Sequence, residues 1–421
     1  MAVELSDRDR EVLDGGRGDA AALAMRIVLE MARVWQADRL IDVTSAHVDS
    51  CLYHGLAGLD FAERLVSGGA RVAVPTTLNV SSLDLLHPDL VRLDPGAASK
   101  ARRLMDAYVA MGCRPTWTCA PYQLERRPAF GEHVAWAESN AIVFANSVLG
   151  ARTNRYGDFI DICAAITGRV PLAGLHEDEH RRGRVVFRLA DDIPARLLHD
   201  EVTATCVGHI LGKEAGTQVP VVVGLPAGTG EDRLKALGAA AASSGAVAMF
   251  HAVGLTPEAP TLPDALGGNE VPRELVIGPD RLRAARDELT TVGTGSVAAV
   301  SVGTPHLSRE ELDRLATLVR RDPPTVPFYA NTGRDVAAEA RAITALSDAG
   351  VTIVTDTCTY VTPILHDIDG PVMTNSAKWA WYAPANLGFD VVFGSLEECV
   401  RSASLGHVWR DPELWGASPS A

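Results

Sequence analysis

Three cysteines of this 421-residue chain stand in polar or conformationally stiff segments. Cys51 lies in TSAHVDSC, Cys119 in PTWTCAPY and Cys358 in DTCTYVTP. Prolines on both sides of Cys119 restrict its backbone, and neither helix nor strand periodicity runs through that segment. Thiolates gathered from distant loops are suited to hold iron, whereas most free cysteines pack as small buried hydrophobic residues. Because the chain has no CxxC pair, spacing alone favours the packing interpretation.

A second set of candidates consists of neutral hydrogen-bonding side chains and arginines in the segments PTTLN and ESNAIVFANSVLGARTNR. They predict a pocket for a small anionic substrate, in which an arginine grips a carboxylate or phosphate with two hydrogen bonds. The alternative is that these side chains only cap loops. So many amides and hydroxyls among apolar residues favour the pocket. The candidates are Thr76, Thr77, Asn79, Glu138, Ser139, Asn140, Asn146, Ser147, Arg152, Thr153, Asn154 and Arg155.

Lys378 is the remaining candidate, in the apolar and aromatic segment MTNSAKWAWYAP. Burial lowers the pKa of a lysine and suits it to proton transfer or anion binding. A lysine that lies along the apolar surface and reaches water with its ammonium group is an equally good interpretation.

The composition excludes several classes of protein. A net charge of −14 argues against a general binder of nucleic acid or of anionic membranes. The N-terminal segment MAVELSDRDREVLDGG is charged, unlike a secretory signal, and no apolar run is long enough to span a bilayer. Seven cysteines with irregular spacing are typical of a reducing compartment. We therefore expect a cytoplasmic protein.

The elements that must position these candidates alternate along the chain between amphipathic helices and short β-branched strands, which predicts an α/β fold with mostly parallel sheets. Ligands bind such sheets at the carboxyl ends of the strands, where most of the candidates fall. Asp19 is expected to cap the first of these helices, and Ser308 with Glu311 to form a capping box. The expected helices cover 21–35, 61–69, 100–112, 231–242 and the segment after 308, and the expected strands cover 39–43, 70–74, 219–224, 297–302 and 350–355.

Seven motifs together resemble the large subunit, or large catalytic region, of the aconitase X family. The resemblance runs over nearly the whole chain, from LIDVTSAHVDSCLYHG to GSLEECVRSA. It implies an aconitase-like fold with several parallel-sheet α/β subdomains around a central cleft, tentatively 1–180, 181–292 and 293–421 within a 1–421 large-subunit region. The motifs are VPTTLN, PTWTCAPYQ, AWAESNAIVFANSVLGARTNRYGDFIDICAAITGR, GLTPEA, GTPHLS, DTCTYVTPI and VMTNSAKWAWYAP.

The resemblance also implies an activity and a cofactor. Members of the family are dehydratases, a bacterial type acting on cis-3-hydroxy-L-proline and an archaeal type acting on mevalonate 5-phosphate. They carry an iron–sulfur cluster, and for this chain the resemblance implies a cluster of 2Fe-2S, 3Fe-4S or 4Fe-4S type, which the sequence does not distinguish, or mononuclear iron. By resemblance Cys119 and Cys358 are metal ligands. The archaeal pattern has its third cysteine where this chain has Thr304, whereas the bacterial pattern has it at Cys51, so this chain resembles the bacterial type.

Two departures from the family pattern affect the expected partner and substrate. The swivel domain that bacterial members carry, with its presumed catalytic base, is absent from this chain, so we expect a separate small swivel subunit and a heterodimer. Ala377 and Trp381 stand where the pattern has glycine and histidine, and the indole is expected to reshape the pocket.

The hypothesis is a hydro-lyase that converts cis-3-hydroxy-L-proline to a pyrroline carboxylate. In it Arg152 or Arg155 anchors the substrate carboxylate, and Lys378 and Ser147 are further candidates for the catalytic chemistry. Mevalonate-5-phosphate dehydration is the nearest alternative. A related enzyme for another small cyclic amino acid or hydroxy acid is a third interpretation. From another class, a non-catalytic paralogue that acts as a binding or scaffold subunit also fits the sequence.

Overall fold

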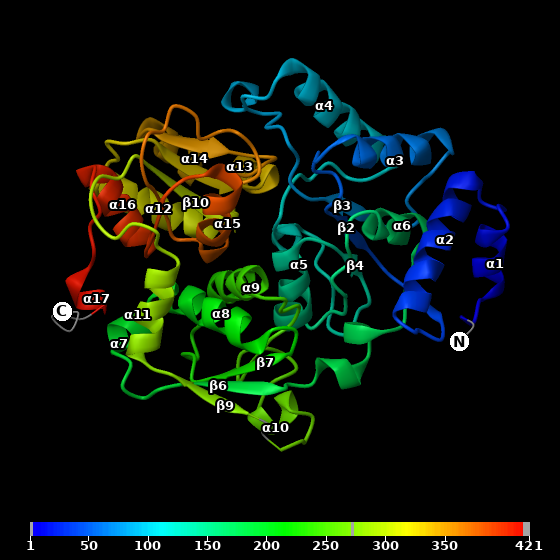
Figure 1. Ribbon diagram of the computed structural model, residues 1–421, viewed down its shortest axis with the longest axis horizontal. Coiled ribbons are helices and arrows are strands. Elements are labelled where there is room, and N and C mark those ends of the chain that lie inside the picture. Colours follow the sequence, from blue (N-terminus) through cyan, green and yellow to red (C-terminus); the bar gives the residue numbers. More distant parts are fainter. Residues whose placement is uncertain (1–2, 271–272, 416–421) are drawn as a thin grey trace. The chain divides into compact units, whose positions relative to one another are not determined.

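The computed structural model describes residues 3–270 and 273–415 of a chain that divides into two units, Met1–Arg182 and Gly183–Ala421. In these described ranges the three larger sheets contain only parallel strand pairs, and a fourth sheet is a short antiparallel pair. Helices separate most of the parallel strands along the chain (Figure 1). The expected α/β class with several parallel sheets is therefore confirmed.

The first unit is built around a three-stranded sheet in the order β3-β2-β4. The strands of this sheet are short, with only two or three residues each. Helices α2 and α6 pack together, and both contribute buried apolar side chains to the core of this unit. The elements are α1 (Asp7–Leu13), α2 (Asp19–Val34), β1 (Leu40–Asp42), β2 (Ala46–Val48), α3 (Leu56–Ser67), β3 (Thr76–Leu78), η1 (Pro88–Leu90), α4 (Pro95–Ala110), η2 (Pro121–Gln123), β4 (Ala135–Trp136), α5 (Ser139–Phe144), η3 (Ala145–Leu149), α6 (Ile160–Thr167), β5 (Arg169–Pro171), η4 (Gly174–His176) and η5 (Asp178–Arg181).

The second unit contains a four-stranded sheet, β8-β7-β6-β9, and a five-stranded sheet, β12-β11-β10-β13-β14. The long strand β10 lies in the middle of the larger sheet and is buried along its whole length. The elements are β6 (Val185–Leu189), α7 (Ala195–Leu198), α8 (Glu201–Ala215), β7 (Pro220–Val223), α9 (Glu231–Ser244), β8 (His251–Ala252), α10 (Leu262–Ala265), β9 (Glu274–Ile277), α11 (Pro279–Glu288), β10 (Ala299–Leu307), α12 (Arg309–Arg321), β11 (Phe328–Thr332), α13 (Arg334–Glu339), α14 (Ala342–Asp348), β12 (Val351–Val354), β13 (Val372–Thr374), α15 (Ala377–Leu387), β14 (Val391–Phe393), α16 (Leu396–Leu405) and α17 (Pro412–Trp415).

Helices α8 and α9 of the second unit lie side by side in unusually close contact (Figure 1). A Cβ atom built on Gly208 would come within 2.1 Å of the carbonyl oxygen of Leu237, and one on Gly212 within 2.6 Å of that of Ala241. Only glycine on α8, facing the alanine-rich side of α9, permits this approach. The pair gives a rigid wall for the cavities described below.

Two expectations about local structure are wrong. Residues 70–74 form no strand; the backbone N–H groups of Ala70, Val72 and Ala73 bond to carbonyls of Leu65, Met111 and Ala165, at or near the ends of helices. These N–H groups are therefore already bonded outside any sheet, and the strand β3 begins only at Thr76.

The second wrong expectation is Asp19 as the cap of α2. Gly18 occupies that position with φ +90°, and Asp19 is the first helical residue, where its charge favours the helix N-terminus.

Other expectations hold. Ser308 and Glu311 form the expected capping box at α12. The strands expected at 219–224, 297–302 and 350–355 correspond to β7, β10 and β12, and β10 continues to Leu307. Within the described residues, no helix has the length and apolar character needed to cross a membrane.

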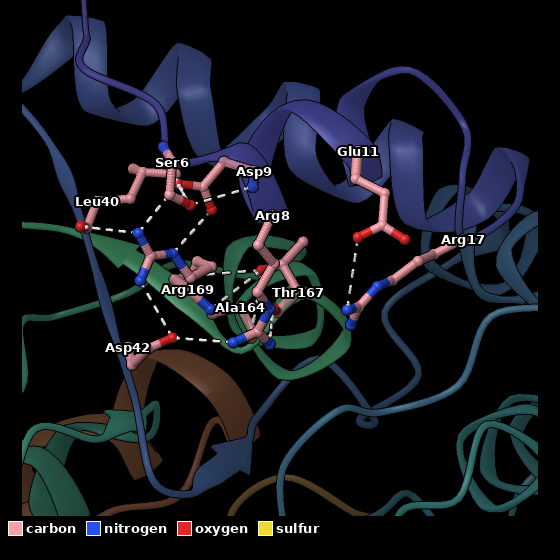
Figure 2. Close-up of polar contacts among 10 residues, drawn as sticks. All are labelled: Ser6, Arg8, Asp9, Glu11, Arg17, Leu40, Asp42, Ala164, Thr167 and Arg169. Atoms are coloured by element: carbon pink, nitrogen blue, oxygen red, sulfur yellow. Dashed lines mark hydrogen bonds and ion pairs between the residues drawn. The ribbon is translucent and has the colours of Figure 1, made fainter.

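A buried ion pair fixes helix α1 to the body of the first unit (Figure 2). The Arg169 guanidinium on β5 donates from Nε and Nη2 to the two carboxylate oxygens of Asp9, at 2.9 and 3.0 Å. Asp9 is fully buried, and it also accepts hydrogen bonds from Ser6. Arg169 donates further to the carbonyl of Leu40 and contacts the exposed Asp42. The N-terminal helix, β1 and β5 therefore depend on one ionised carboxylate.

Replacing Asp9 with Asn is expected to cost about 3 kcal/mol of stability, because it leaves a buried guanidinium with half its partner. The matched control is Asp42→Asn, which removes an exposed partner of the same arginine and is expected to cost less than about 1 kcal/mol. Urea unfolding checks both values, and equal losses would contradict the assignment.

The pH dependence of the Asp9 pair has a definite sign. Burial alone would raise the pKa of Asp9, but hydrogen bonds from Ser6 and Arg169 outweigh burial and lower it. The stabilisation is therefore complete above the pKa of the unfolded carboxyl, about 3.9, and is lost as the pH falls through the lower folded value. Wild type and Asp9→Asn should converge in stability only in that acid range.

Candidate active site

The carboxyl ends of the three parallel strands in the first unit bring together three polar side chains. Asp49 follows β2, Asn79 follows β3 and Glu138 follows β4. The Asn79 side-chain amide donates a hydrogen bond to the Asp49 carboxylate, and the Asn79 backbone N–H donates to the carbonyl of Val48 at 2.9 Å. The other side-chain atom of Asn79, Oδ1, is buried and has no hydrogen-bond partner among the described residues. This strand edge therefore offers a carboxylate and an unused acceptor to a ligand.

Asp161, at the start of α6, holds the turn that leads to Cys51. Its Oδ2 atom accepts the backbone N–H groups of Asp49 and Ser50 at 2.8 and 3.0 Å, and its Oδ1 atom accepts the Ser50 hydroxyl at 2.9 Å. Burial raises the pKa of Asp161 to about 6, and the backbone hydrogen bonds oppose this rise. Near neutral pH the ionised carboxylate therefore fixes the backbone on which Cys51 sits.

Asp49 and Asp161 are site residues that the sequence reasoning missed. Burial, followed by the nearby charge of Glu138, raises the pKa of Asp49 to about 7. A carboxyl group that titrates near neutral pH is a candidate for proton transfer. The signal available in the sequence was the position of Asp49 directly after a strand, in the same HVDSC segment as Cys51.

The backbone around Cys119 is fixed by the neighbouring polar residues. The Asn140 amide donates to the carbonyl of Cys119 at 2.9 Å, and Tyr122 donates its hydroxyl to Asn140 at 2.6 Å. Thr118 donates its backbone N–H to the carbonyl of Leu78 at 3.1 Å, which ties the segment to β3. The cysteine itself is buried. The proline-rich segment that carries Cys119 is thus held from two sides.

Glu138 and Ser139, predicted to bind substrate, are partly used in the scaffold. Glu138 has a left-handed backbone, φ +68°, and its carboxylate caps α5 by accepting the N–H groups of Asn140 and Ala141, each at 3.0 Å. The Ser139 hydroxyl donates to the same carboxylate at 3.2 Å. Such a strained residue at the edge of a sheet is typical of functional sites.

The surroundings of the Cys51 sulfur fit a protonated thiol. Its Sγ lies 3.4 to 3.7 Å from three backbone carbonyl oxygens, those of Val48, Asn79 and Val80, which can only accept a hydrogen bond. Burial, together with the charges of Asp49 and Asp161, raises its pKa well above the ordinary value. A bound metal ion deprotonates a coordinating thiol outright, so a ligand role for Cys51 requires the charge of the metal itself.

The surroundings of the Cys358 sulfur, in the second unit, are of the opposite kind. Its Sγ lies 2.9 Å from the Thr304 hydroxyl. Burial raises the pKa of Cys358, whereas hydrogen bonds from Thr304 and the Tyr360 backbone and the charge of Lys378 favour the thiolate. These donors and the nearby ammonium are suited to a sulfur that carries negative charge.

Lys378 is buried near the N-terminus of α15, with its ammonium group 5.7 Å from the ring centre of Tyr360. A cavity of about 40 Å³ lies against it and is also lined by Thr304, Ser376 and Lys235. Lys235 is ion-paired with Asp232 and Glu311, so its charge is matched locally. An adjacent cavity of about 190 Å³ shares part of this lining. The second unit therefore holds two lysines and the Thr304 hydroxyl around one small cavity, and that hydroxyl contacts the Cys358 sulfur.

Ala377 and Trp381, the two residues that depart from the family pattern, differ in whether they line a cavity. Ala377 lines the smaller cavity. Trp381 lines neither of these cavities; its ring lies 5.5 Å from that of His209 on α8, and the residue is 41% exposed. Within the second unit, its indole therefore covers the α8 surface.

The remaining candidates make hydrogen bonds and ion pairs that connect η3, the segment 151–154 and η5. Asn146 exchanges two hydrogen bonds with the backbone of Thr153, at 2.9 and 3.0 Å, and Arg181 donates to both oxygens of Asn146. Arg152 donates to the carbonyl of His176 at 3.0 Å and pairs with Asp178. These contacts join segments of the first unit to one another, so the side chains have a structural role there.

For four further predicted residues the structure gives only local contacts or burial. Thr76 donates to the carbonyl of Val74 at 2.9 Å, and the Thr77 hydroxyl lies 2.8 Å from Nδ1 of His47. Ser147 is buried in η3. Arg155 is exposed. Among the described residues no group of three or more His, Cys, Asp and Glu side chains is arranged to hold a metal ion.

Comparison with known proteins identifies relatives over almost the whole chain. Family models match at residues 2–179 (aconitase X first domain), 183–287 (second domain) and 297–404 (third domain). The chain is 45% identical to cis-3-hydroxy-L-proline dehydratase of Pseudomonas aeruginosa over 403 residues, which cover 94% of this chain and 69% of that protein. It is 35% identical to the phosphomevalonate dehydratase large subunit of Methanothermobacter thermautotrophicus, over 95% of this chain and 98% of that subunit. The crystal structure of Thermococcus kodakaraensis aconitase X in its holo form matches with a TM-score of 0.85 and 31% identity, over 95% of this chain and 100% of that one.

Replacing Asp161 with Asn is expected to free the turn at Asp49 and Ser50. One oxygen of the side chain becomes an amide donor, so at least one backbone N–H or the Ser50 hydroxyl loses its acceptor, at a cost of about 1–3 kcal/mol. Faster amide hydrogen exchange at Asp49 and Ser50 measures the effect. The control Asp158→Asn changes an exposed carboxylate of the same segment and should leave those amides unchanged. Unchanged protection in Asp161→Asn would contradict the assigned role.

Proposed function

The chain belongs to the aconitase X family, and we propose that it is a hydro-lyase that removes water from cis-3-hydroxy-L-proline together with a small swivel-domain subunit. The observation that supports this substrate is the 45% identity with the Pseudomonas dehydratase across 94% of the chain. The Hypocrea jecorina protein of the same name is 41% identical across 97% of the chain. The archaeal relatives named for phosphomevalonate are more distant, at 35% identity and below.

The separate partner is proposed from the names and lengths of the relatives. The chain aligns with 98% of the Methanothermobacter protein, whose name as a large subunit implies a small one. The family resemblance assigns the presumed catalytic base to the swivel domain. In this proposal the small subunit therefore completes the reaction.

The reaction requires one proton to leave Cα and the hydroxyl on C3 to leave as water. A base takes the Cα proton, the electron pair forms a double bond between Cα and C3, and the leaving hydroxyl receives a proton. Negative charge develops towards the substrate carboxylate during proton removal, and a fixed cation nearby stabilises it. In the proposal Lys378 holds or delivers a proton at the cavity of the second unit, where its ammonium group is buried.

The substrate carboxylate is assigned to an arginine of the first unit. Arg155 is exposed, whereas Arg152 binds substrate only if its ion pair with Asp178 opens. Ser147 is proposed as a further catalytic hydroxyl. The residues proposed to orient the rest of the substrate are Thr76, Thr77, Asn79, Glu138, Ser139, Asn140, Asn146 and Thr153.

Iron is the proposed cofactor, with Cys51, Cys119 and Cys358 as its sulfur ligands. Held by these three thiolates, iron would supply a Lewis acid for the departing hydroxyl. The donors around Cys358 and the fixed backbone at Cys119 support their roles as thiolates. For Cys51 to serve as a ligand, the charge of the metal would have to favour release of its thiol proton, because carbonyl oxygens surround its sulfur.

The substrate assignment is tested by assaying the iron-loaded chain, co-expressed with a small swivel-domain protein from the same organism, on cis-3-hydroxy-L-proline and on mevalonate 5-phosphate. We expect dehydration of the former at a kcat/KM at least about a hundredfold above the latter, because carboxylate and phosphate need different cationic ligands. Preference for the phosphate would reverse the assignment. An iron-free chain inactive on both would favour the scaffold interpretation.

The ligand assignment is tested by serine variants of the three cysteines, purified without oxygen. Each of Cys51→Ser, Cys119→Ser and Cys358→Ser is expected to lose at least about tenfold in iron affinity, because an alcohol is a poor substitute for a thiolate. Cys163→Ser, at a fully buried cysteine outside the proposed set, is the control and should keep its iron. If Cys51→Ser binds as much iron as the wild type, Cys51 is a structural thiol and not a ligand, in agreement with the three carbonyl oxygens around its sulfur.

A further inference from the structure

The Thr304 hydroxyl lies 2.9 Å from Sγ of Cys358, a candidate ligand sulfur. The two residues are 54 positions apart in the sequence, on β10 and after β12. A sulfur that binds metal has no proton, so in that state the hydroxyl must be the donor and the sulfur the acceptor. The direction of this hydrogen bond is thus fixed by the chemistry of the ligand.

Thr304 is itself held in place from the other side. The Ser376 hydroxyl donates to the carbonyl of Thr304 and accepts the N–H of Trp379 at 3.0 Å as the cap of α15. The same turn carries Lys378 into the cavity that Thr304 lines. The hydroxyl therefore approaches the sulfur from a rigid part of the fold.

The loop that carries Cys358 is fixed independently of Thr304. Arg334 donates to both carboxylate oxygens of the buried Asp356, at 2.6 and 2.5 Å. His306 lies with Nε2 3.1 Å from the carbonyl of Thr357, on the residue before the cysteine. With the backbone held, rotation of the Cys358 side chain is the freedom that remains.

The residue after Cys358 is held equally well. The backbone N–H of Thr359 donates to Asn331 at 3.0 Å, and its hydroxyl accepts from Trp379 at 3.1 Å. The Thr359 hydroxyl also lies 2.7 Å from that of Ser301. Removal of the Thr304 hydroxyl alone should therefore leave the loop backbone in place.

We propose that Thr304 is a positioning residue that donates a hydrogen bond to the metal-bound sulfur of Cys358, fixes its direction and withdraws electron density from it. The inference rests on the proposed iron ligation by Cys358. Hydrogen bonds to ligand sulfurs raise the reduction potential of iron–sulfur centres, and partners of this kind also strengthen metal retention. Thr304 thus tunes the iron site without touching the metal.

The experiment compares Thr304→Val, which keeps the shape and loses the donor, with Thr304→Ser, which keeps the donor. The control is Thr332→Val, because the Thr332 hydroxyl is equally buried on the neighbouring strand β11 and donates to the carbonyl of Leu307 at 2.8 Å. Each iron-loaded protein is measured for reduction potential, visible absorption and the rate of iron loss to a chelator, with the thermal unfolding midpoint as a check on folding.

We expect Thr304→Val to show a lower reduction potential, a shifted absorption band and iron loss about tenfold faster than wild type. Thr304→Ser should return all three towards wild type, and Thr332→Val should change only the unfolding midpoint. Wild-type potential and iron loss in Thr304→Val, with iron absent from Cys358→Ser, would overturn the role of Thr304 alone. Iron retained by Cys358→Ser would overturn the ligand assignment and this inference with it.

Discussion

Buried polar side chains that bind loop backbones are the constraint on which the proposed chemistry depends. Soft sulfur ligands hold a metal only when their backbones are fixed, and each candidate cysteine stands in irregular chain. In this protein Asp161 fixes the turn before Cys51, Asn140 fixes the carbonyl of Cys119, and Arg334 fixes Asp356 in the loop of Cys358. These hydrogen bonds are buried or partly buried, and the acceptors Asp161 and Asp356 are fully buried, so a broken bond leaves an unpaired group and costs more than a surface contact.

The charge around each sulfur divides the cysteines into two kinds. Hydroxyl and backbone donors and a lysine surround Cys358, whereas carbonyl oxygens and carboxylates surround Cys51. Burial raises the pKa of both thiols, but the donors and the lysine oppose this rise at Cys358, so its thiolate depends less on the metal's own charge than that of Cys51 does. Burial, followed by the charge of Glu138, raises the pKa of Asp49 to about 7 and gives the strand edge a group that can exchange protons near neutral pH.

The sequence predicted those features that depend on neighbouring residues. The capping box of Ser308 and Glu311, the parallel α/β class and the position of Cys358 after β12 are set by local patterns and were recognised. Residues 70–74 have the composition of a strand, but the N–H groups of Val72 and Ala73 bond to the carbonyls of Met111 and Ala165, which are distant in the sequence and which no local pattern records.

The missed site residues have the same cause. Asp161 acts on a turn 112 positions away, and Thr304 reaches Cys358 across 54 positions. Motifs identified the family from one sequence, yet they did not reveal that Arg152 and Asn146 donate hydrogen bonds to the backbone carbonyls of His176 and Thr153. Such partners follow from the three-dimensional path of the chain.

X-ray absorption at the iron edge, on protein purified without oxygen, tests the central claim most directly. The account predicts bound iron whose nearest neighbours include sulfur, with that sulfur signal reduced in Cys358→Ser. Protein without iron, or iron surrounded only by oxygen and nitrogen, would contradict it.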